Sequence, residues 1–297
     1  PYLLLARFEL ALERVEGQWQ RTDAATRALI GKLGATSPAG LSLRRAWLAS
    51  LARRELWQEF LDNYDPAAPT VALECQYWNA RIARAATEDL APAITARWLT
   101  PYRLPPECEP SFQWLRAQGA LTNALIEERV KLLLDNGETG FARTIARRLP
   151  AETAGPLLER ADFIERPGAM LDALLATPER TADADAVRDG WARLARNDPT
   201  AALERYAALS ARTTSGDGVA ELSLGLALGL AWDRRPEALE YFARVPEAAL
   251  DDTAREWQAR AAMWAGDWDG VTSAIAQLSE QRRTQPAWRY WAARAAA

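Results

Sequence analysis

Apolar residues recur at the three- and four-residue spacing of amphipathic helices along most of the chain. Within 122–134, for example, Ile126, Val130 and Leu133 fall on one helical face, and Lys131 falls on another. No long stretch alternates between apolar and polar residues as a half-buried strand would. Ala, Leu, Arg and Glu, which are strong helix formers, are abundant, and β-branched residues are sparse. The pattern predicts an all-α chain.

Short polar breaks separate the predicted helices at regular intervals. They lie at 52–55, 85–88, 118–121, 135–138, 197–199, 233–236 and 266–268. Markers within or directly beside them repeat at intervals of 33 and 33 residues, at Arg53, Ala86 and Gly119, and of 35 and 34 residues, at Asn197, Trp232 and Gly266. This period is the length of one helix-turn-helix unit in tetratricopeptide-like arrays.

The clearest repeat unit spans 257–278. Its first helix carries Trp257 and Trp264, a tight turn follows at 265–267, and its second helix carries Ile275. Because a single hairpin cannot cover its own apolar face, neighbouring hairpins must stack, and a small rotation at each step produces a superhelix. We expect one helical-repeat domain over 1–297, built as a superhelical array of helical hairpins with a ring or horseshoe shape.

Composition and charge exclude several classes of function. The 297 residues contain no histidine, which excludes Ser/His/Asp and Cys/His catalysis and His-ligated zinc in this chain. The formal charge of −4 and the interspersed arginines argue against a nucleic-acid partner. The longest apolar run, Leu222–Trp232, is too short for a membrane span, which needs roughly 20 residues. Because the chain opens with Pro1 rather than Met, we expect a leader or N-terminal segment to have been removed.

Thirteen tryptophans raise the question of glycan binding, because indole faces stack on the apolar faces of sugars. Several lie at recurring hairpin positions, namely Trp57, Trp191, Trp232, Trp264 and Trp268. We interpret these mainly as packing between helices, with a few left to line a concave surface. Gly225 and Gly229 are interpreted as a place where two helix backbones approach closely.

Asp251, Asp252 and Glu256 suggest a magnesium-dependent helical enzyme, because paired carboxylates can hold a cation for diphosphate chemistry. The fuller DDxxD pattern fails, since Arg255 stands where the third aspartate would be. Acidic residues also stabilise the first turn of a helix, whose amide groups point toward them. We favour the helix-opening interpretation and expect no metal and no cofactor.

Cys75 and Cys108 are the two cysteines of the chain. In a reducing compartment they would be inert thiols, and in an oxidising compartment they could close a loop. Spacing alone leaves both possibilities open. No CxxC motif or histidine is present to make them metal ligands.

The segment 51–57 resembles the superhelical N-terminal region of the soluble lytic murein transglycosylases. The resemblance continues through 75–77, 98–100, Cys108, 128–129, the turn at 136–140 and the aromatic cluster at 288–291. It is most specific from about residue 51 to 150, and in 151–245 it rests mainly on helical character.

The resemblance implies a periplasmic enzyme that cleaves the β-1,4 bond between N-acetylmuramic acid and N-acetylglucosamine in peptidoglycan and leaves a 1,6-anhydro sugar. It implies a ring of helices that carries a separate lysozyme-like catalytic domain, with peptidoglycan glycan strands, that catalytic domain and other cell-wall enzymes as partners. It also implies a disulfide between Cys75 and Cys108, which match the paired cysteines of the family.

The catalytic motifs of that family are missing from this chain. Its catalytic glutamate is followed by serine, and no glutamate here is. Its Gly-Leu-Met-Gln motif is also absent, because the two methionines, Met170 and Met263, lie in other contexts. We therefore expect no catalytic residue here, and interpret the chain as the non-catalytic superhelical domain. A free-standing tetratricopeptide-like scaffold for protein partners is the alternative.

Overall fold

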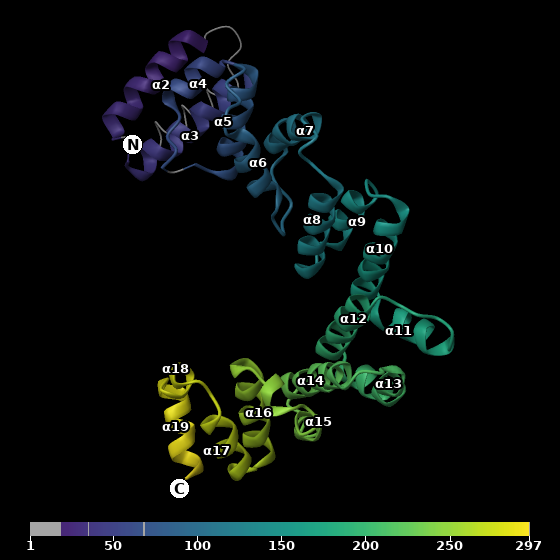
Figure 1. Cartoon of the computed structure of the whole chain (residues 1–297). Coiled ribbons are helices and arrows are strands. Elements are labelled where there is room, and N and C mark those ends of the chain that lie inside the picture. The colour runs from purple at the N-terminus through teal and green to yellow at the C-terminus, as the bar shows by residue number, and fades with distance from the viewer. Residues whose placement is uncertain (1–18, 35, 68, 297) are drawn as a thin grey trace. The chain divides into compact units, whose positions relative to one another are not determined.

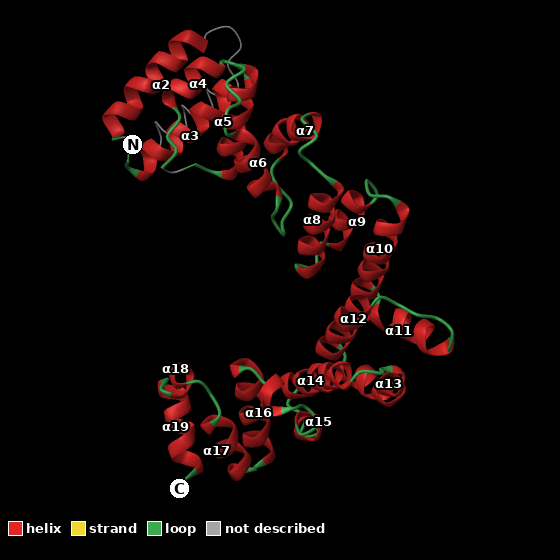
Figure 2. Ribbon diagram, in the orientation of Figure 1, coloured by secondary structure: helices red, strands yellow, loops and turns green. Residues whose placement is uncertain are grey.

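The computed structural model describes residues 19–34, 36–67 and 69–296, and these residues form helices joined by turns, without a strand (Figure 1, Figure 2). This confirms the prediction of an all-α array of helical hairpins. The chain divides into two compact units, Pro1–Leu132 and Leu133–Ala297. The single domain over 1–297 and the ring or horseshoe shape stay predictions.

The first unit is a series of short helices. Its elements are α2 (Trp19–Leu33), α3 (Pro38–Arg53), α4 (Trp57–Asn63), α5 (Val71–Ala83), α6 (Leu90–Trp98), the 3-10 turn η1 (Pro106–Cys108), α7 (Glu109–Ala117) and α8 (Asn123–Asp135), the last of which ends just inside the second unit. Successive helices pack on one another, α2 on α3, α3 on α4 and α4 on α5. Each hairpin therefore buries the face of its neighbour.

The second unit continues the same pattern. Its elements are α9 (Thr139–Ala146), α10 (Ala151–Glu165), α11 (Pro167–Ala176), α12 (Ala184–Asn197), α13 (Pro199–Arg212), α14 (Gly216–Trp232), α15 (Ala238–Phe242), η2 (Glu247–Ala249), α16 (Asp252–Ala265), α17 (Trp268–Ala276), α18 (Glu280–Arg283) and α19 (Pro286–Ala295). Every predicted break lies at the junction of two successive helices, and four of the seven overlap the end of a helix by one or two residues. Within the described residues, no helix has both the length and the apolar character needed to cross a membrane.

The apolar cores are local, as stacked hairpins require. One core cluster joins α2 to α5 around Trp47 and Phe60, and a second joins α10 to α16 around Trp191 and Phe242. A third lies among α16, α17 and α19 around Ile275. Each cluster draws its side chains from consecutive helices.

A buried aspartate joins α2 to α3. Asp23 is only 6% exposed, and it accepts a hydrogen bond from the indole Nε1 of Trp47 at 2.8 Å. Arg54 adds two hydrogen bonds to the same carboxylate, at 2.8 and 2.9 Å. Because a buried charge is tolerated only when it is paired and hydrogen-bonded, these donors are what allows Asp23 to lie in the core.

Close contact between α12 and α14 depends on glycine. A methyl group added at Gly229 would lie 2.0 Å from the carbonyl oxygen of Ala195, and one added at Gly225 would lie 3.0 Å from the indole nitrogen of Trp191. Trp191 is buried and donates a hydrogen bond to the carbonyl of Leu222 at 2.8 Å. The interpretation as a close backbone approach is therefore confirmed at Gly229, whereas Gly225 leaves room for the indole of Trp191.

A disulfide ties α5 to η1 in the first unit. Cys75 and Cys108 are fully buried, and their Cα atoms lie 4.7 Å apart. Beside them, Asn79 donates a hydrogen bond to the carbonyl of Glu107 at 2.7 Å, and the Ser111 hydroxyl donates one to the carbonyl of Cys75 at 3.4 Å. The disulfide that the resemblance implied is confirmed.

Candidate functional site

A tryptophan-lined pocket near the C-terminal end of the second unit is the site that best combines exposure, aromatic surface and polar groups. It has a volume of about 470 Å³ and lies among α16, the start of α17, α18 and α19. The residues that line it are Glu256, Arg260, Met263, Trp264, Trp268, Arg282, Gln285, Ala287, Trp288 and Trp291. Binding sites for small ligands combine apolar surface with a few polar groups in this way.

Local sequence explains how the pocket is built. Asp251 precedes α16 and its carboxylate accepts a hydrogen bond from the amide of Ala254 at 2.7 Å. The helix ends at Gly266, whose φ of 73° is the left-handed conformation that glycine adopts readily. Asp267 then caps α17 by accepting from the amide of Gly270 at 2.9 Å. The tight turn places Trp264 and Trp268 on either side of the connection.

Trp264 and Trp268 are the exposed aromatic residues of the pocket. Trp264 is 43% exposed and Trp268 is 39% exposed. Of the tryptophans interpreted as packing residues, Trp191 is buried and Trp57 and Trp232 are partly buried. Trp264 and Trp268 lie at the two ends of the turn that joins α16 to α17, and both line the pocket. Trp264 also packs against Trp257, with ring centres 6.4 Å apart.

Glu256 organises the inner wall of the pocket. Its carboxylate accepts a hydrogen bond from the indole of Trp288 at 3.1 Å and lies 3.5 Å from Arg260 and 3.6 Å from Arg282. The guanidinium of Arg260 stacks over the Trp288 ring at 5.0 Å and over the Trp257 ring at 4.8 Å. These contacts hold the carboxylate of Glu256 and the guanidinium of Arg260 next to the aromatic side chains of the pocket.

The three carboxylates that suggested a magnesium site have separate partners. Asp251 caps α16, and Glu256 holds Trp288 and two arginines. Asp252 accepts hydrogen bonds from the hydroxyl and the amide of Ser279, which hold the pKa of this carboxyl below its ordinary value. The expectation that Asp251 and Asp252 open a helix is confirmed. In the part of the chain that the structure describes, no group of three or more carboxylate or cysteine side chains is placed to hold a metal ion.

Arg129, from the segment 128–129 that contributes to the resemblance, lies in the first unit. It is 1% exposed, and its guanidinium carbon lies 4.0 Å from the centre of the Trp98 ring and 5.7 Å from that of Phe112. Trp98 and Phe112 meet edge to face, with ring centres 5.0 Å apart. Arg129 is therefore part of the packing of α6, α7 and α8, and not of the pocket.

The fold and the pocket define a class: an all-α protein of stacked helical hairpins with an aromatic, charged pocket in its second unit. No protein-family model matches the chain. It is, however, homologous to the soluble lytic murein transglycosylases. Those of Escherichia coli strain K12 and Salmonella typhimurium strain LT2 are each 25% identical to it over 261 residues. The match covers 87% of this chain and 40% of each relative, so the chain spans well under half of their length.

Solved structures agree on the fold. The 70 kDa soluble lytic transglycosylase of Escherichia coli superposes with a TM-score of 0.77 at 23% identity, over 99% of this chain and 47% of that one. An inactive mutant of the lytic transglycosylase Slt from Pseudomonas aeruginosa gives a TM-score of 0.66 at 23% identity, over 99% of this chain and 52% of that one.

Proposed function

We propose that this chain is the non-catalytic helical region of a periplasmic lytic transglycosylase. The complete enzyme cleaves the β-1,4 bond between N-acetylmuramic acid and N-acetylglucosamine in peptidoglycan and leaves 1,6-anhydro-N-acetylmuramic acid. In this proposal the helical region carries a separate catalytic domain and guides glycan strands or other cell-wall enzymes.

The observation that carries this proposal is the pattern of coverage. Nearly all of this chain, 99%, superposes on 47% of a solved lytic transglycosylase, and the sequence match covers 40% of the curated relatives. The catalytic motifs expected from the resemblance are absent from the sequence, which supports a division between this helical region and a catalytic domain.

Catalysis is tested with the chain alone on purified peptidoglycan sacculi. A lytic transglycosylase needs one glutamate that acts as acid and then base beside the bound glycan. Glu256, the acidic residue of the pocket, already contacts Trp288, Arg260 and Arg282. We expect no release of anhydro-muropeptides, measured by liquid chromatography and mass spectrometry. The full-length Escherichia coli enzyme is the positive control, and release at a comparable rate would contradict the proposal.

Glycan contact is tested at the pocket. The flat indoles of Trp264 and Trp268 can stack against the apolar faces of sugar rings, and Glu256, Arg260 and Arg282 lie nearby for hydroxyl groups. We expect the double change Trp264→Ala and Trp268→Ala to lower the fraction of chain retained by sacculi severalfold, measured by co-sedimentation.

The matched control for the pocket is Tyr102→Ala. Tyr102 is 59% exposed and lies in the first unit, outside this pocket. Its removal deletes an exposed aromatic side chain without changing the pocket, so retention should stay at the level of the unchanged chain. If all versions sediment equally with sacculi, the pocket is not the contact with glycan.

A further inference from the structure

Several charged side chains line a second cavity in the second unit. Its volume is about 630 Å³, and it lies where the end of α8 and the turn to α9 meet α10, α12 and the end of α14. It shares no residue with the tryptophan-lined pocket. Its charged residues are Asp135, Arg160, Asp189, Arg193 and Arg196, so cations outnumber anions.

One arginine of this cavity is fully neutralised by the protein. Arg160 is 7% exposed and donates hydrogen bonds to Asp135 and to Asp189, each at 2.5 Å. Two carboxylates on one guanidinium satisfy its charge and orient its fork. Arg160 is therefore already paired within the protein. The arginines of the cavity that remain available to a ligand are Arg193 and Arg196.

Arg193 and Arg196 lie one turn apart on α12, and both are exposed at the cavity. Within the described part of the chain, neither forms an ion pair with a carboxylate or donates a hydrogen bond to a protein acceptor. Some exposed arginines of the second unit pair with a carboxylate, as Arg188 and Arg244 do. Arg193 and Arg196 differ from the other unpaired ones in that both line the same cavity. Two adjacent guanidinium groups lining a cavity without a counter-ion are suited to an anionic ligand.

Stacking on Trp232 holds the guanidinium of Arg196 in place before a ligand binds. Its guanidinium carbon lies 4.1 Å from the centre of the Trp232 ring, and the Trp257 ring packs edge-on against Trp232 at 5.9 Å. A cation stacked on an indole keeps its N–H groups free at the edge of the stack. Arg196 therefore needs little further ordering to form two parallel hydrogen bonds to a carboxylate.

Beside Arg193, the cavity is lined by a turn whose left-handed backbone favours glycine. Gly137 has a φ of 78°, and a methyl group added there would lie 3.4 Å from Nη1 of Arg193. Glycine adopts this left-handed backbone readily, whereas another residue would be strained there. The turn lies in the segment 136–140 that contributes to the resemblance, and no residue of this segment lines the tryptophan-lined pocket.

We propose that Arg193 and Arg196, with Trp232 beneath Arg196, form a binding site for the carboxylates of short acidic peptides. This inference rests on the proposed function in one respect: the peptides attached to peptidoglycan glycan strands carry such carboxylates. The cavity volume lies within the range of sites that hold small ligands, roughly 300–1,000 Å³.

The test uses a soluble diacid, N-acetylmuramoyl-L-alanyl-D-glutamate, and its diamide as the uncharged analogue. Isothermal titration calorimetry on the chain at low salt should show binding of the diacid and at least tenfold weaker binding of the diamide. The double change Arg193→Gln and Arg196→Gln should weaken diacid binding at least tenfold. Added salt should weaken the binding of the diacid to the unchanged chain, because the attraction is electrostatic.

The matched control is the double change Arg147→Gln and Arg148→Gln. Both residues are exposed, belong to the same unit and lie outside the cavity, so the control removes equal charge. It should bind the diacid like the unchanged chain. Absence of diacid binding, equal binding of diacid and diamide, or unchanged binding by the Arg193 and Arg196 variant would each overturn the inference. Retention on sacculi through Trp264 and Trp268 would still stand in those cases, so the two proposals can fail separately.

Discussion

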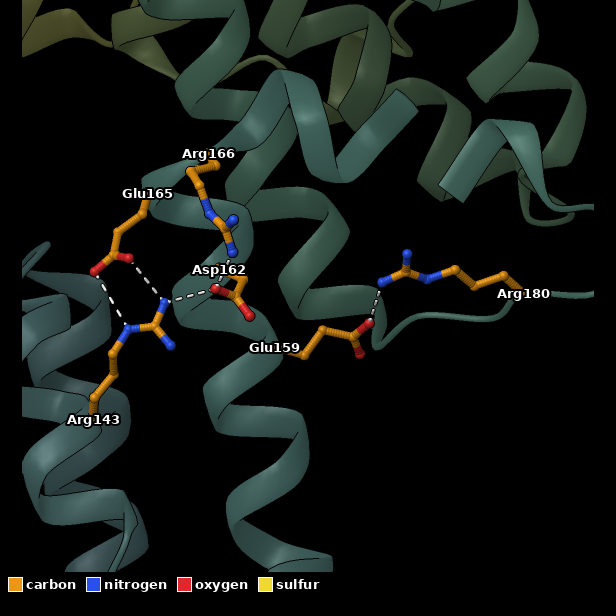
Figure 3. Close-up of polar contacts among 6 residues, drawn as sticks. All are labelled: Arg143, Glu159, Asp162, Glu165, Arg166 and Arg180. Carbon is orange, nitrogen blue, oxygen red and sulfur yellow. Dashed lines mark hydrogen bonds and ion pairs between the residues drawn. The ribbon is translucent and has the colours of Figure 1, made fainter. Parts of the chain in front are cut away.

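At the scale of single residues, charged side chains hold neighbouring helices of the second unit together. Arg143 on α9 reaches both Asp162 and Glu165 on α10, at 2.9 Å in each case (Figure 3). Arg166 donates a second hydrogen bond to Asp162 at 2.7 Å (Figure 3). Earlier on α10, Glu159 pairs with Arg180 at 3.2 Å, and Arg180 lies in the segment between α11 and α12 (Figure 3).

These contacts lower the pKa of two carboxyl groups. The hydrogen bond from Arg143 is the main cause that lowers the pKa of Glu165 from its ordinary 4.5. At Asp162, burial acts to raise the pKa, but hydrogen bonds from Arg166 and Arg143 outweigh it, so the pKa falls below its ordinary 3.8. Both groups therefore bind protons less readily in the folded chain than in the unfolded chain.

This gives a prediction for Arg143→Gln. A carboxyl group with a lowered folded pKa contributes stability that is present above its unfolded pKa and is lost as the pH falls through its folded pKa. At pH 7 the variant should be less stable by ~1 kcal/mol or less, because the pairs are partly exposed. The difference should shrink as the pH falls below the ordinary values of 4.5 and 3.8. Urea unfolding at several pH values measures it, and a difference that stays constant with pH would contradict the assignment.

At the scale of elements, the contact between α12 and α14 is set by glycine. Gly229→Ala would place a methyl group 2.0 Å from the carbonyl oxygen of Ala195, so the two helices must move apart. We expect a loss of roughly 1–3 kcal/mol in the free energy of unfolding, the usual cost of overpacking. Denaturant unfolding followed by circular dichroism measures this loss.

The control for that prediction is Gly155→Ala. Gly155 lies within α10, and nothing approaches within 4 Å of the position that its Cβ would take. Alanine is the better helix former by roughly 0.5–1 kcal/mol, so this variant should be slightly more stable than the unchanged chain. A similar loss in both variants would show that helix propensity, and not the close approach, governs Gly229.

At the scale of the whole molecule, the disulfide stabilises one unit. Changing Cys75 and Cys108 to Ala removes a link between residues 33 apart, both of them in the unit Pro1–Leu132. The chain-entropy relation gives a cost of ~3–4 kcal/mol for a loop of this length. Hydrogen exchange should become faster in α5 and η1. The amides of α14, which belong to the other unit, are the internal control, and equal acceleration there would contradict a local effect.

The sequence indicated the all-α class and the connections at its polar breaks, whereas other connections, such as that between α11 and α12, had no predicted break. Capping residues such as Asp251 and turn glycines such as Gly266 act on their immediate neighbours, and helical periodicity is visible within a few turns. The disulfide required the resemblance, because the spacing of Cys75 and Cys108 left a free pair of thiols equally open. The close approach at Gly229 was predicted because small residues recur on one helical face.

The sequence pattern could not indicate which aromatic and charged side chains are accessible to a ligand. Trp191 and Trp264 were both interpreted as packing residues, yet one is 2% and the other 43% exposed. Arg196 resembles many other arginines in the sequence until its stacking on Trp232 and its place in the cavity are known. Local chemistry thus determined where helices begin and end in this protein. Which side chains line a pocket depended on tertiary structure, because exposure and pairing are set by neighbours that are distant in the sequence.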